Sequence, residues 1–227
     1  MSKSEEPAIT TATEKVRPNF RKKRLLHGLI VGYTGFWIFT AVAPMDRSDW
    51  FLESILALVL VGYLVATYRG FPLSDASYLL ITAFLILQAT GAHYTYSKVP
   101  LGFWFQETFD LSRNHYDRFV HFCFGLMFAY PIREVFLRVA NTKGFWSYYL
   151  PLDVTVAFSA LFEILEGIVV WFAPENLGAT YLGTQGDDWD AQKDMACAAV
   201  GACLCMLVTM YFHRLLRKRD RPQSPVV

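Results

Sequence analysis

The sequence predicts an all-α integral membrane protein, a bundle of six transmembrane helices with both termini in the cytoplasm. Of its 227 residues, 54% are apolar and only 18% are charged, whereas a soluble domain carries about 25% charged residues. The apolar residues also gather into six runs, each long enough for a helix across about 30 Å of hydrocarbon. The net charge of +1 provides no basic field for nucleic acid, so we expect no nucleic-acid partner.

Each predicted span has its own signal. The first run follows a basic cluster at residues 21–24, which is typical of a topology signal. The second has 18 residues, which extend about 27 Å as a helix. The connections before the fourth and sixth runs are about 20 residues long, which favours functional loops. The predicted spans are Leu25–Pro44, Phe51–Tyr68, Ala76–Tyr94, Tyr116–Val139, Tyr148–Phe172 and Gln192–His213.

The distribution of basic residues predicts the orientation. With the N-terminus inside, 16 Lys and Arg residues face the cytoplasm and 5 face outward, as the positive-inside rule requires. We therefore expect a disordered cytoplasmic tail at 1–20, a membrane domain at 21–214 and a basic cytoplasmic tail at 215–227. The apolar loop at residues 100–109 is expected to lie in the outer interface or to cap a site.

The fourth span begins with Asp117 and His121, four residues apart and hence on one helix face. A carboxylate one turn from an imidazole can orient it for metal ligation or for acid–base work. Alternatively, Asp117 is a charge at the positive end of a helix. Arg118 between them is expected to pair locally or to reach outward to the interface.

The fifth span carries Glu163 and Glu166, three residues apart with apolar neighbours on both sides. Two carboxylates this close in a medium of low dielectric constant share a proton or hold a cation. Since no Lys or Arg lies in the spans at this depth, we favour a proton-sharing or metal-binding pair over a simple ion pair.

The entrance to the sixth span contains Asp187, Asp190 and Asp194, spaced for one face of a helix. Oxygen ligands of this kind suit a hard cation, although Asp187 and its neighbour Asp188 also fit a hydrophilic loop. His93, at the end of the third span, is a further candidate ligand.

The topology brings these side chains to the outer half of the membrane, on the spans at 76–94, 116–139, 148–172 and 192–213. Gly125, Gly167 and Gly201 lie on the last three of these spans, and small residues let helices approach closely. We expect catalytic roles for Asp117, His121, Glu163 and Glu166. A divalent metal ion would be held by His121, Glu163, Glu166, Asp190 and Asp194, with His93 as an additional ligand.

The motifs Asn-His-Tyr-Asp117-Arg-Phe-Val-His121, Phe-Glu163-Ile-Leu-Glu166 and Gly-Asp187-Asp-Trp-Asp190-Ala-Gln-Lys-Asp194 resemble the YjdF-like family of bacterial inner-membrane proteins. A more distant resemblance, through Asp117, Arg118 and His121, is to VanZ-like proteins. These resemblances imply a multi-pass protein of the bacterial inner membrane with a link to the cell envelope. They imply no defined reaction.

Three functions remain open. The first is a membrane-embedded hydrolase or transferase, metal-dependent or acid–base, that acts on a lipid-linked or envelope substrate. The second is a proton- or ion-coupled transporter, which intramembrane carboxylates and histidines would serve. The third is a structural envelope protein in which the polar cluster only joins helices.

Overall fold

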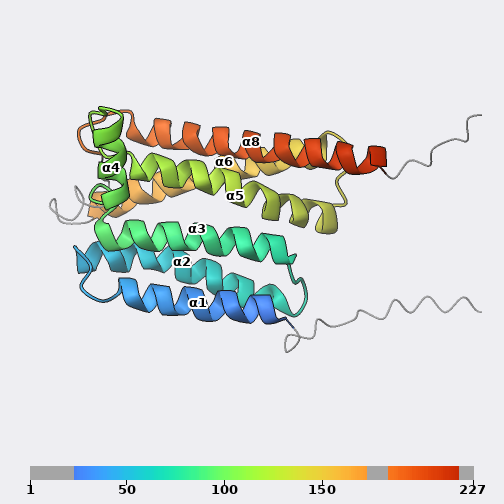
Figure 1. The fold of residues 1–227 in the computed structure, drawn as a ribbon, viewed down its shortest axis with the longest axis horizontal. Coiled ribbons are helices and arrows are strands. Elements are labelled where there is room, and N and C mark those ends of the chain that lie inside the picture. The colour runs from blue at the N-terminus through green and yellow to red at the C-terminus, as the bar shows by residue number, and fades with distance from the viewer. Residues whose placement is uncertain (1–22, 173–183, 220–227) are drawn as a thin grey trace, which may run out of the picture.

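The computed structural model describes residues 23–172 and 184–219, and within these ranges the chain is helical with no strand. Five long helices and the slightly shorter α1 run lengthwise in an elongated bundle, and α4 lies across one end (Figure 1). The helices are α1 (Arg24–Thr40), α2 (Arg47–Tyr68), α3 (Asp75–Tyr94), α4 (Pro100–Thr108), α5 (Tyr116–Val139), α6 (Trp146–Phe172) and α8 (Asp190–Arg219).

Five of these helices, α2, α3, α5, α6 and α8, are long and apolar enough to cross a membrane, judged by length and composition among the described residues. The all-helical membrane fold is therefore confirmed. The remaining predicted span, Leu25–Pro44, corresponds to α1, which has 17 residues. At about 1.5 Å per residue, α1 is about 26 Å long and lies at the lower limit for a transmembrane helix.

The helix bounds follow the predicted runs with small differences. The fourth predicted span coincides with α5, whereas α6 and α2 begin a few residues earlier than their apolar runs. The sixth span continues past His213 to Arg219, so the helix extends into the segment that we assigned to the basic tail. The apolar loop at 100–109 forms the short helix α4. The predicted tail at 1–20 lies outside the described residues.

Side-chain caps define where α2 and α3 begin. The Asp46 carboxylate accepts hydrogen bonds from the backbone N–H groups of Ser48 and Asp49, at 2.8 and 3.0 Å. The Ser74 hydroxyl accepts from the Ser77 N–H at 3.2 Å, and Glu134 of α5 accepts from the Ser74 N–H at 2.8 Å. These bonds satisfy backbone donors that have no partner within the first turn of a helix, and Glu134 also ties α5 to α3.

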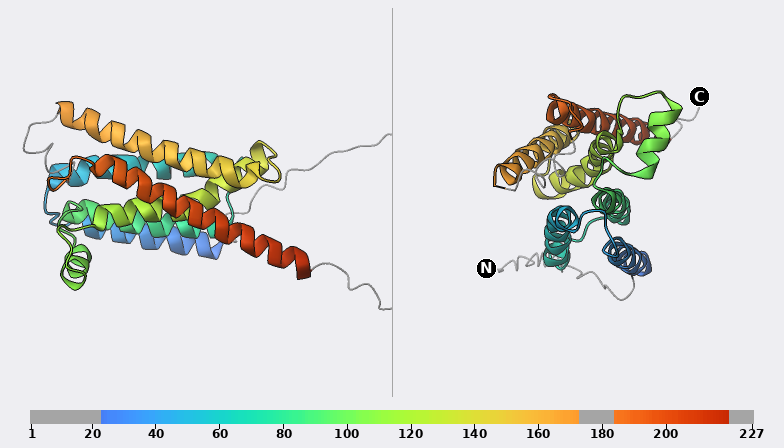
Figure 2. Two further views of the ribbon diagram at one scale, coloured as in Figure 1. Left: turned by 90° about the horizontal axis from the view of Figure 1, so that it is seen from above. Right: turned by 90° about the vertical axis from the view of Figure 1, so that its left-hand side faces the viewer.

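The helices are arranged around a central pair, α3 and α5. Helices α1 and α2 pack on α3, while α6 and α8 pack on α5 and on each other (Figure 2). Helices α2 and α6 are not among the closely packed pairs. The beginning of α1 and the end of α8 lie at the same end of the bundle, and α4 lies at the opposite end (Figure 1).

The closest helix packing, between α5 and α8, depends on two glycines. A Cβ atom added to Gly125 would lie 1.9 Å from the carbonyl oxygen of Ala198, and one added to Gly201 would lie 2.1 Å from that of Phe122. The two backbones are therefore in direct contact, as the sequence predicts for these residues. The expectation for Gly167 was wrong, because no atom of another helix among the described residues lies within 4 Å of its added Cβ.

Candidate functional site

The α4 end of the bundle carries a buried ion-pair network between the loop before α5 and the start of α8. Arg113, only 7% exposed, donates two hydrogen bonds to the Asp190 carboxylate, at 2.6 and 3.2 Å. It donates a third to the carbonyl oxygen of Thr184 at 2.7 Å. A two-bond Arg–carboxylate pair is geometrically specific, so it fixes the first turn of α8 against the loop.

Arg118, on the first turn of α5, joins the same network. It donates to Asp190 at 3.0 Å and also to Asp187. Its Nε lies 4.0 Å from Asp194 Oδ1. Arg118 was expected to pair locally or to reach outward; it does contact His115 locally, and it also bridges from α5 to three carboxylates of the α8 entrance.

Two loop residues beside this network have shifted pKa values. The Lys193 ammonium, which donates to Asp187 at 2.6 Å, the Trp189 N–H and the Arg118 guanidinium hold the pKa of the Asp187 carboxyl well below its usual range. Burial, followed by the positive charges of Arg118 and Arg113, lowers the pKa of His115. The Nδ1 of His115 lies 3.2 Å from a guanidinium nitrogen of Arg118. Since that nitrogen can only donate, the imidazole is neutral and accepts.

Deeper in the bundle lies the second part of the site, centred on His121. Its Nε2 is 3.4 Å from Glu163 Oε1 and 3.7 Å from Asp117 Oδ1. Its Nδ1 is 3.4 Å from the Ser159 hydroxyl. His121 is 8% exposed and Asp194 only 2% exposed. Helices α5, α6 and α8 thus each supply one or more polar groups to one point. We call Asp117, His121, Glu163 and Asp194 the inner cluster.

The inner cluster has the donor atoms of a cation site. One ligand atom from each of Asp117, His121 and Asp194 lies within 4.8 Å of the other two. Metal–ligand bonds of about 2.1 to 2.6 Å place ligands on opposite sides of an ion about 4 to 5 Å apart. In addition, Glu163 Oε1 and Asp194 Oδ1 are buried without a hydrogen-bond donor among the described residues. Buried carboxylate oxygens in this state fit a divalent cation or a shared proton.

Two further glutamates border the inner cluster. Glu166 is one turn along α6 from Glu163, on the same face of the helix. Glu53 of α2 is buried and accepts hydrogen bonds from Gln88 and Tyr96, each at 3.4 Å. Burial raises the pKa of Tyr96 well above its usual value, so its hydroxyl remains a donor.

The predicted site residues separate into three groups. Asp117, His121, Glu163 and Asp194 converge, with Glu166 beside them. Asp190 lies in the neighbouring network, where its carboxylate is bonded to two arginines. The structure does not bring His93 into the cluster, because its Nδ1 is 2.8 Å from the carbonyl oxygen of Thr40 on the α1 side.

Some residues of the site were missed. The predicted site uses only the last four spans, but α2 also contributes, since Asp49 and Glu53 are both buried. A glutamate inside the apolar run Phe51–Tyr68 is itself the signal that could have found Glu53. Arg113 and Asn114 gave no such signal, since each lies in a loop that reads as polar and exposed.

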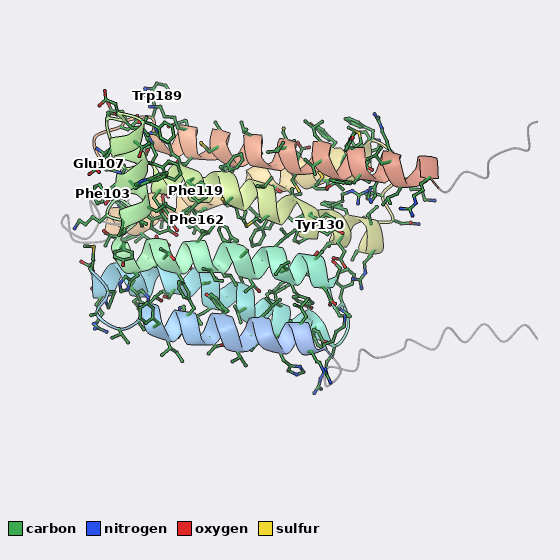
Figure 3. The ribbon with its side chains drawn as sticks, viewed as in Figure 1. Phe103, Glu107, Phe119, Tyr130, Phe162 and Trp189 are labelled. Carbon is green, nitrogen blue, oxygen red and sulfur yellow. The ribbon has the colours of Figure 1, made fainter. Side chains whose placement is uncertain are left out.

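Asn114 connects the site to α4. Its side chain donates to the carbonyl oxygen of Val99 at 3.0 Å and accepts from the Tyr116 N–H at 3.0 Å. A Cβ added to Gly102 of α4 would lie 1.7 Å from Asn114 Oδ1, so α4 sits directly on this side chain. Figure 3 shows α4, with Phe103 and Glu107, at the same end as Phe119 and Phe162, while Tyr130 lies toward the other end. Helix α4 therefore covers the end of the bundle near the site, consistent with the predicted cap.

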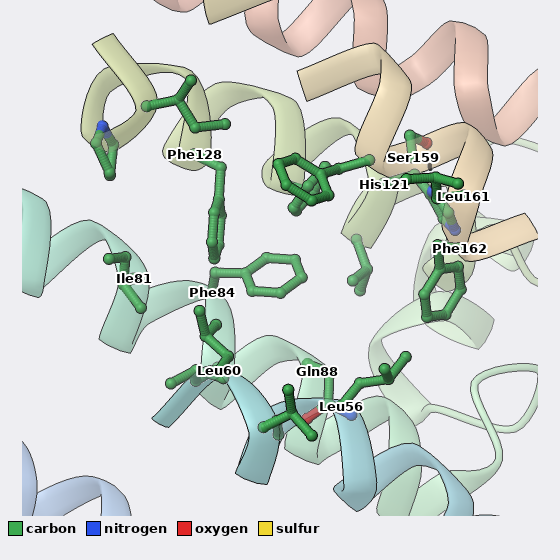
Figure 4. Close-up of a pocket in the computed structure, with 18 of the residues that line it drawn as sticks. Leu56, Leu60, Ile81, Phe84, Gln88, His121, Phe128, Ser159, Leu161 and Phe162 are labelled. Carbon is green, nitrogen blue, oxygen red and sulfur yellow. Dashed lines mark hydrogen bonds between the residues drawn. The ribbon is translucent and has the colours of Figure 1, made fainter. Parts of the chain in front are cut away.

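The inner cluster borders a cavity of about 880 Å³. Its wall is built by α2, α3, α5 and α6, with Asp117, His121 and Ser159 at its polar end. Glu53, Gln88 and Tyr96 also line it. Most of the remaining wall is apolar, and Leu60, Phe84 and Phe128 are among the side chains that line it (Figure 4). This volume lies within the usual range for ligand sites of about 300–1,000 Å³.

Comparison with known proteins identifies the family. Residues 25–215 match the family described as "Predicted membrane protein (DUF2238)". The chain belongs to this family. It is also 37% identical over 202 residues to the inner membrane protein YjdF of Escherichia coli (strain K12), which covers 87% of this chain and 95% of the relative. The YjdF-like resemblance is thus confirmed, whereas the more distant resemblance to VanZ-like proteins receives no support from these matches. No solved structure matches the chain.

Proposed function

We propose that this protein is a membrane-embedded hydrolase or transferase whose inner cluster acts on a lipid-linked or envelope substrate. The observation that carries the proposal is the convergence of Asp117, His121 and Asp194 within 4.8 Å beside a ligand-sized cavity. Burying carboxylates and an imidazole together in a membrane bundle costs free energy, so such groups are typical of a functional site. Interhelical hydrogen bonds alone stabilise by about 0.6 to 2 kcal/mol each, which offsets little of the free-energy cost of burying these groups.

The arrangement supports two kinds of chemistry at the same residues. A divalent ion bound by Asp117, His121 and Asp194 would supply Lewis-acid polarisation of a phosphoryl or carbonyl oxygen. Without it, His121 is placed to act as a general base, because Asp117 and Glu163 flank its Nε2 and would stabilise the imidazolium that forms. Ser159, next to Nδ1, orients the ring in both cases.

The proposed setting is the inner membrane, with six spans and both ends of the bundle in the cytoplasm. The family match and the relative's name support the membrane. The shared position of the beginning of α1 and the end of α8 supports an even number of crossings, and the excess of basic residues supports the orientation. In this setting, the inner cluster, which is named for its depth in the helix bundle, lies in the half of the bilayer that faces away from the cytoplasm.

The two alternatives have less support. A proton-coupled transporter needs polar steps along its whole path, yet the end of the cavity near Leu73 and Phe136 is apolar among the described residues. A purely structural role fits the ion-pair network of Arg113, Arg118 and Asp190, whose bonds connect a loop to two helices. It leaves Glu163 Oε1 and Asp194 Oδ1 buried without a hydrogen bond among the described residues, with only the longer contacts to His121 and Arg118, at 3.4 and 4.0 Å.

The test is the metal content of detergent-purified wild-type protein beside His121→Ala, Glu163→Gln and the control Asp153→Asn. Asp153 is an exposed carboxylate on the same helix as Glu163, so it reports on non-specific binding. We expect a stoichiometric divalent ion in the wild type and control and its loss in both cluster variants. Turnover of lipid-linked phosphates would then be screened with the same four proteins.

A folded wild type that binds no metal after metal is added back would refute the metal-dependent form. The acid–base form would then be tested by the pH profile of hydrolysis. An absence of turnover in both tests would refute the proposed function.

A further inference from the structure

The cavity beside the inner cluster is a groove that opens sideways into the bilayer. Its two rims are α2 and α6, which pack on α3 and α5 respectively but are not a closely packed pair. Val59 and Tyr63 on one rim and Phe158 and Leu161 on the other line the cavity and are more than half exposed. Since both rim helices are candidate membrane spans, the opening between them faces lipid.

The groove is amphipathic along its length. One end is polar, where Glu53, Gln88, Tyr96, Asp117, His121 and Ser159 line it. The opposite end, near Leu73 and Phe136, is apolar. A ligand that matches this wall has a polar head and a long hydrocarbon body, which is the form of a membrane lipid.

The length of the groove narrows the class of lipid. Asp117 and Phe136 of α5 both line it, and 19 helical steps of about 1.5 Å separate them by about 28 Å. The whole hydrocarbon core is about 30 Å thick, so one leaflet provides about 15 Å. An ordinary acyl chain would fill about half of the groove, whereas a long isoprenoid chain would extend through it.

We propose that the groove between α2 and α6 binds the hydrocarbon chain of a long-chain isoprenoid lipid, with its phosphate-bearing head at the polar end beside His121. The inference deepens the proposed function by naming its substrate class, and the headgroup part rests on that function. No Lys or Arg lines the groove among the described residues, so a phosphate beside Glu53 and Asp117 requires the divalent ion of the inner cluster.

The binding energy comes from the head of the lipid. A chain gains little by leaving bilayer hydrocarbon for an apolar groove, because both surroundings are equally apolar. Selection for the polyprenyl lipid therefore depends on the polar end and on a groove long enough to hold its chain. This predicts local enrichment over bulk phospholipid rather than a general affinity for hydrocarbon.

The experiment places a photo-reactive benzoylphenylalanine at Val59 or, as the control, at Val65 of the full-length protein. Both valines are on α2 and are similarly exposed, at 64% and 69%, but only Val59 lines the groove. The protein is reconstituted with divalent metal in phosphatidylethanolamine and phosphatidylglycerol vesicles that contain a small fraction of a long-chain polyprenyl phosphate. Adducts are identified by intact mass after illumination.

We expect the ratio of polyprenyl to phospholipid adducts to be about tenfold higher at Val59 than at Val65. Equal ratios at the two positions would overturn the proposal. An adduct between two copies of the protein at Val59 would also overturn it, because a helix of a second copy would then occupy the groove.

Repeating the experiment with Asp194→Asn separates this inference from the proposed function. If the wild type shows enrichment at Val59 but neither metal nor turnover, the groove binds the lipid and the enzyme proposal is wrong. If the wild type binds metal and turns over a substrate without enrichment at Val59, the enzyme proposal stands and the groove assignment is wrong. Loss of both enrichment and metal in Asp194→Asn is the result expected if the two share one site.

Discussion

The contact between α5 and α8 allows a sharp test of how this bundle holds its site. Replacing Gly125 with alanine adds a Cβ that would lie 1.9 Å from the carbonyl oxygen of Ala198. A carbon and a carbonyl oxygen in ordinary contact are about 3.3 Å apart, so the two backbones must separate by about 1.4 Å. Because backbone atoms cannot rotate away as a side chain can, we expect a loss of about 3 kcal/mol, at the upper end of overpacking costs.

Gly201→Ala is expected to behave in the same way, since its Cβ would lie 2.1 Å from the carbonyl oxygen of Phe122. Gly62→Ala on α2 is the matched control, because nothing lies within 4 Å of its added Cβ. A helical Gly→Ala change in open space stabilises by about 0.5 to 1 kcal/mol. The measurement is unfolding of the purified protein in mixed micelles by titration with SDS, followed by circular dichroism.

The same substitutions should disturb the site. Gly125 is one turn from His121 on α5, and Gly201 is two turns from Asp194 on α8. Separating the helices therefore moves the two ligands apart, and we expect metal binding to weaken together with stability. Unfolding curves of Gly125→Ala and Gly201→Ala that coincide with that of Gly62→Ala would refute the close helix contact.

The ion-pair network, a histidine and a helix cap give three further predictions. Asp190→Asn removes the charged partner to which buried Arg113 donates two hydrogen bonds and leaves Asp187, at 3.8 Å, as a more distant carboxylate. We therefore expect a loss of about 3 kcal/mol in the same SDS assay, whereas exposed Asp188→Asn should change stability by under about 0.5 kcal/mol. The folded-state pKa of His115 is lowered, so its contribution to the stability of the fold is complete above about pH 6.5 and is lost as the pH falls below that value. Thermal unfolding between pH 7.5 and 5.5 should therefore show less acid sensitivity in His115→Gln than in the wild type. Unchanged sensitivity would contradict the lowered pKa of His115. Glu134→Gln weakens the bonds from α5 to the start of α3, and hydrogen exchange by mass spectrometry should report faster exchange in the first turn of α3, with no change there counting against the cap.

Much of the site could be predicted from the sequence, because the free-energy cost of burying an ionisable side chain depends on the short apolar segment around it. An ionisable side chain in a run of apolar residues needs an explanation wherever the run folds, and helical spacing alone puts Asp117 on the same face as His121 and Glu163 on the same face as Glu166. Antiparallel spans then bring the four segments to one level. These steps led to Asp117, His121, Glu163 and Asp194 as members of one cluster, and the structure brings these four together.

The sequence could not predict which acidic residues are paired with arginine and which belong to the inner cluster. Asp190 and Asp194 are one helical turn apart at the same entrance to α8, yet the first is bonded to Arg113 and Arg118 while the second has a buried oxygen with no hydrogen-bond donor among the described residues. Arg113 is distant in the chain and lies in a loop, so only the folded loop reveals that it neutralises Asp190. The sequence also could not show that the ring of His93 turns toward Thr40 and away from the inner cluster.

The sequence by itself determined the membrane class, the helices and the residues that are costly to bury, because transfer into hydrocarbon and helical periodicity act on short segments. Only the tertiary structure decided which carboxylates are paired with arginine, that Glu53 of α2 joins the site, and that α2 and α6 leave a groove between them. These features depend on the direction and separation of helices far apart in the chain. That geometry is set by contacts such as Gly125 against Ala198, where the absence of a side chain on glycine lets the two helix backbones touch.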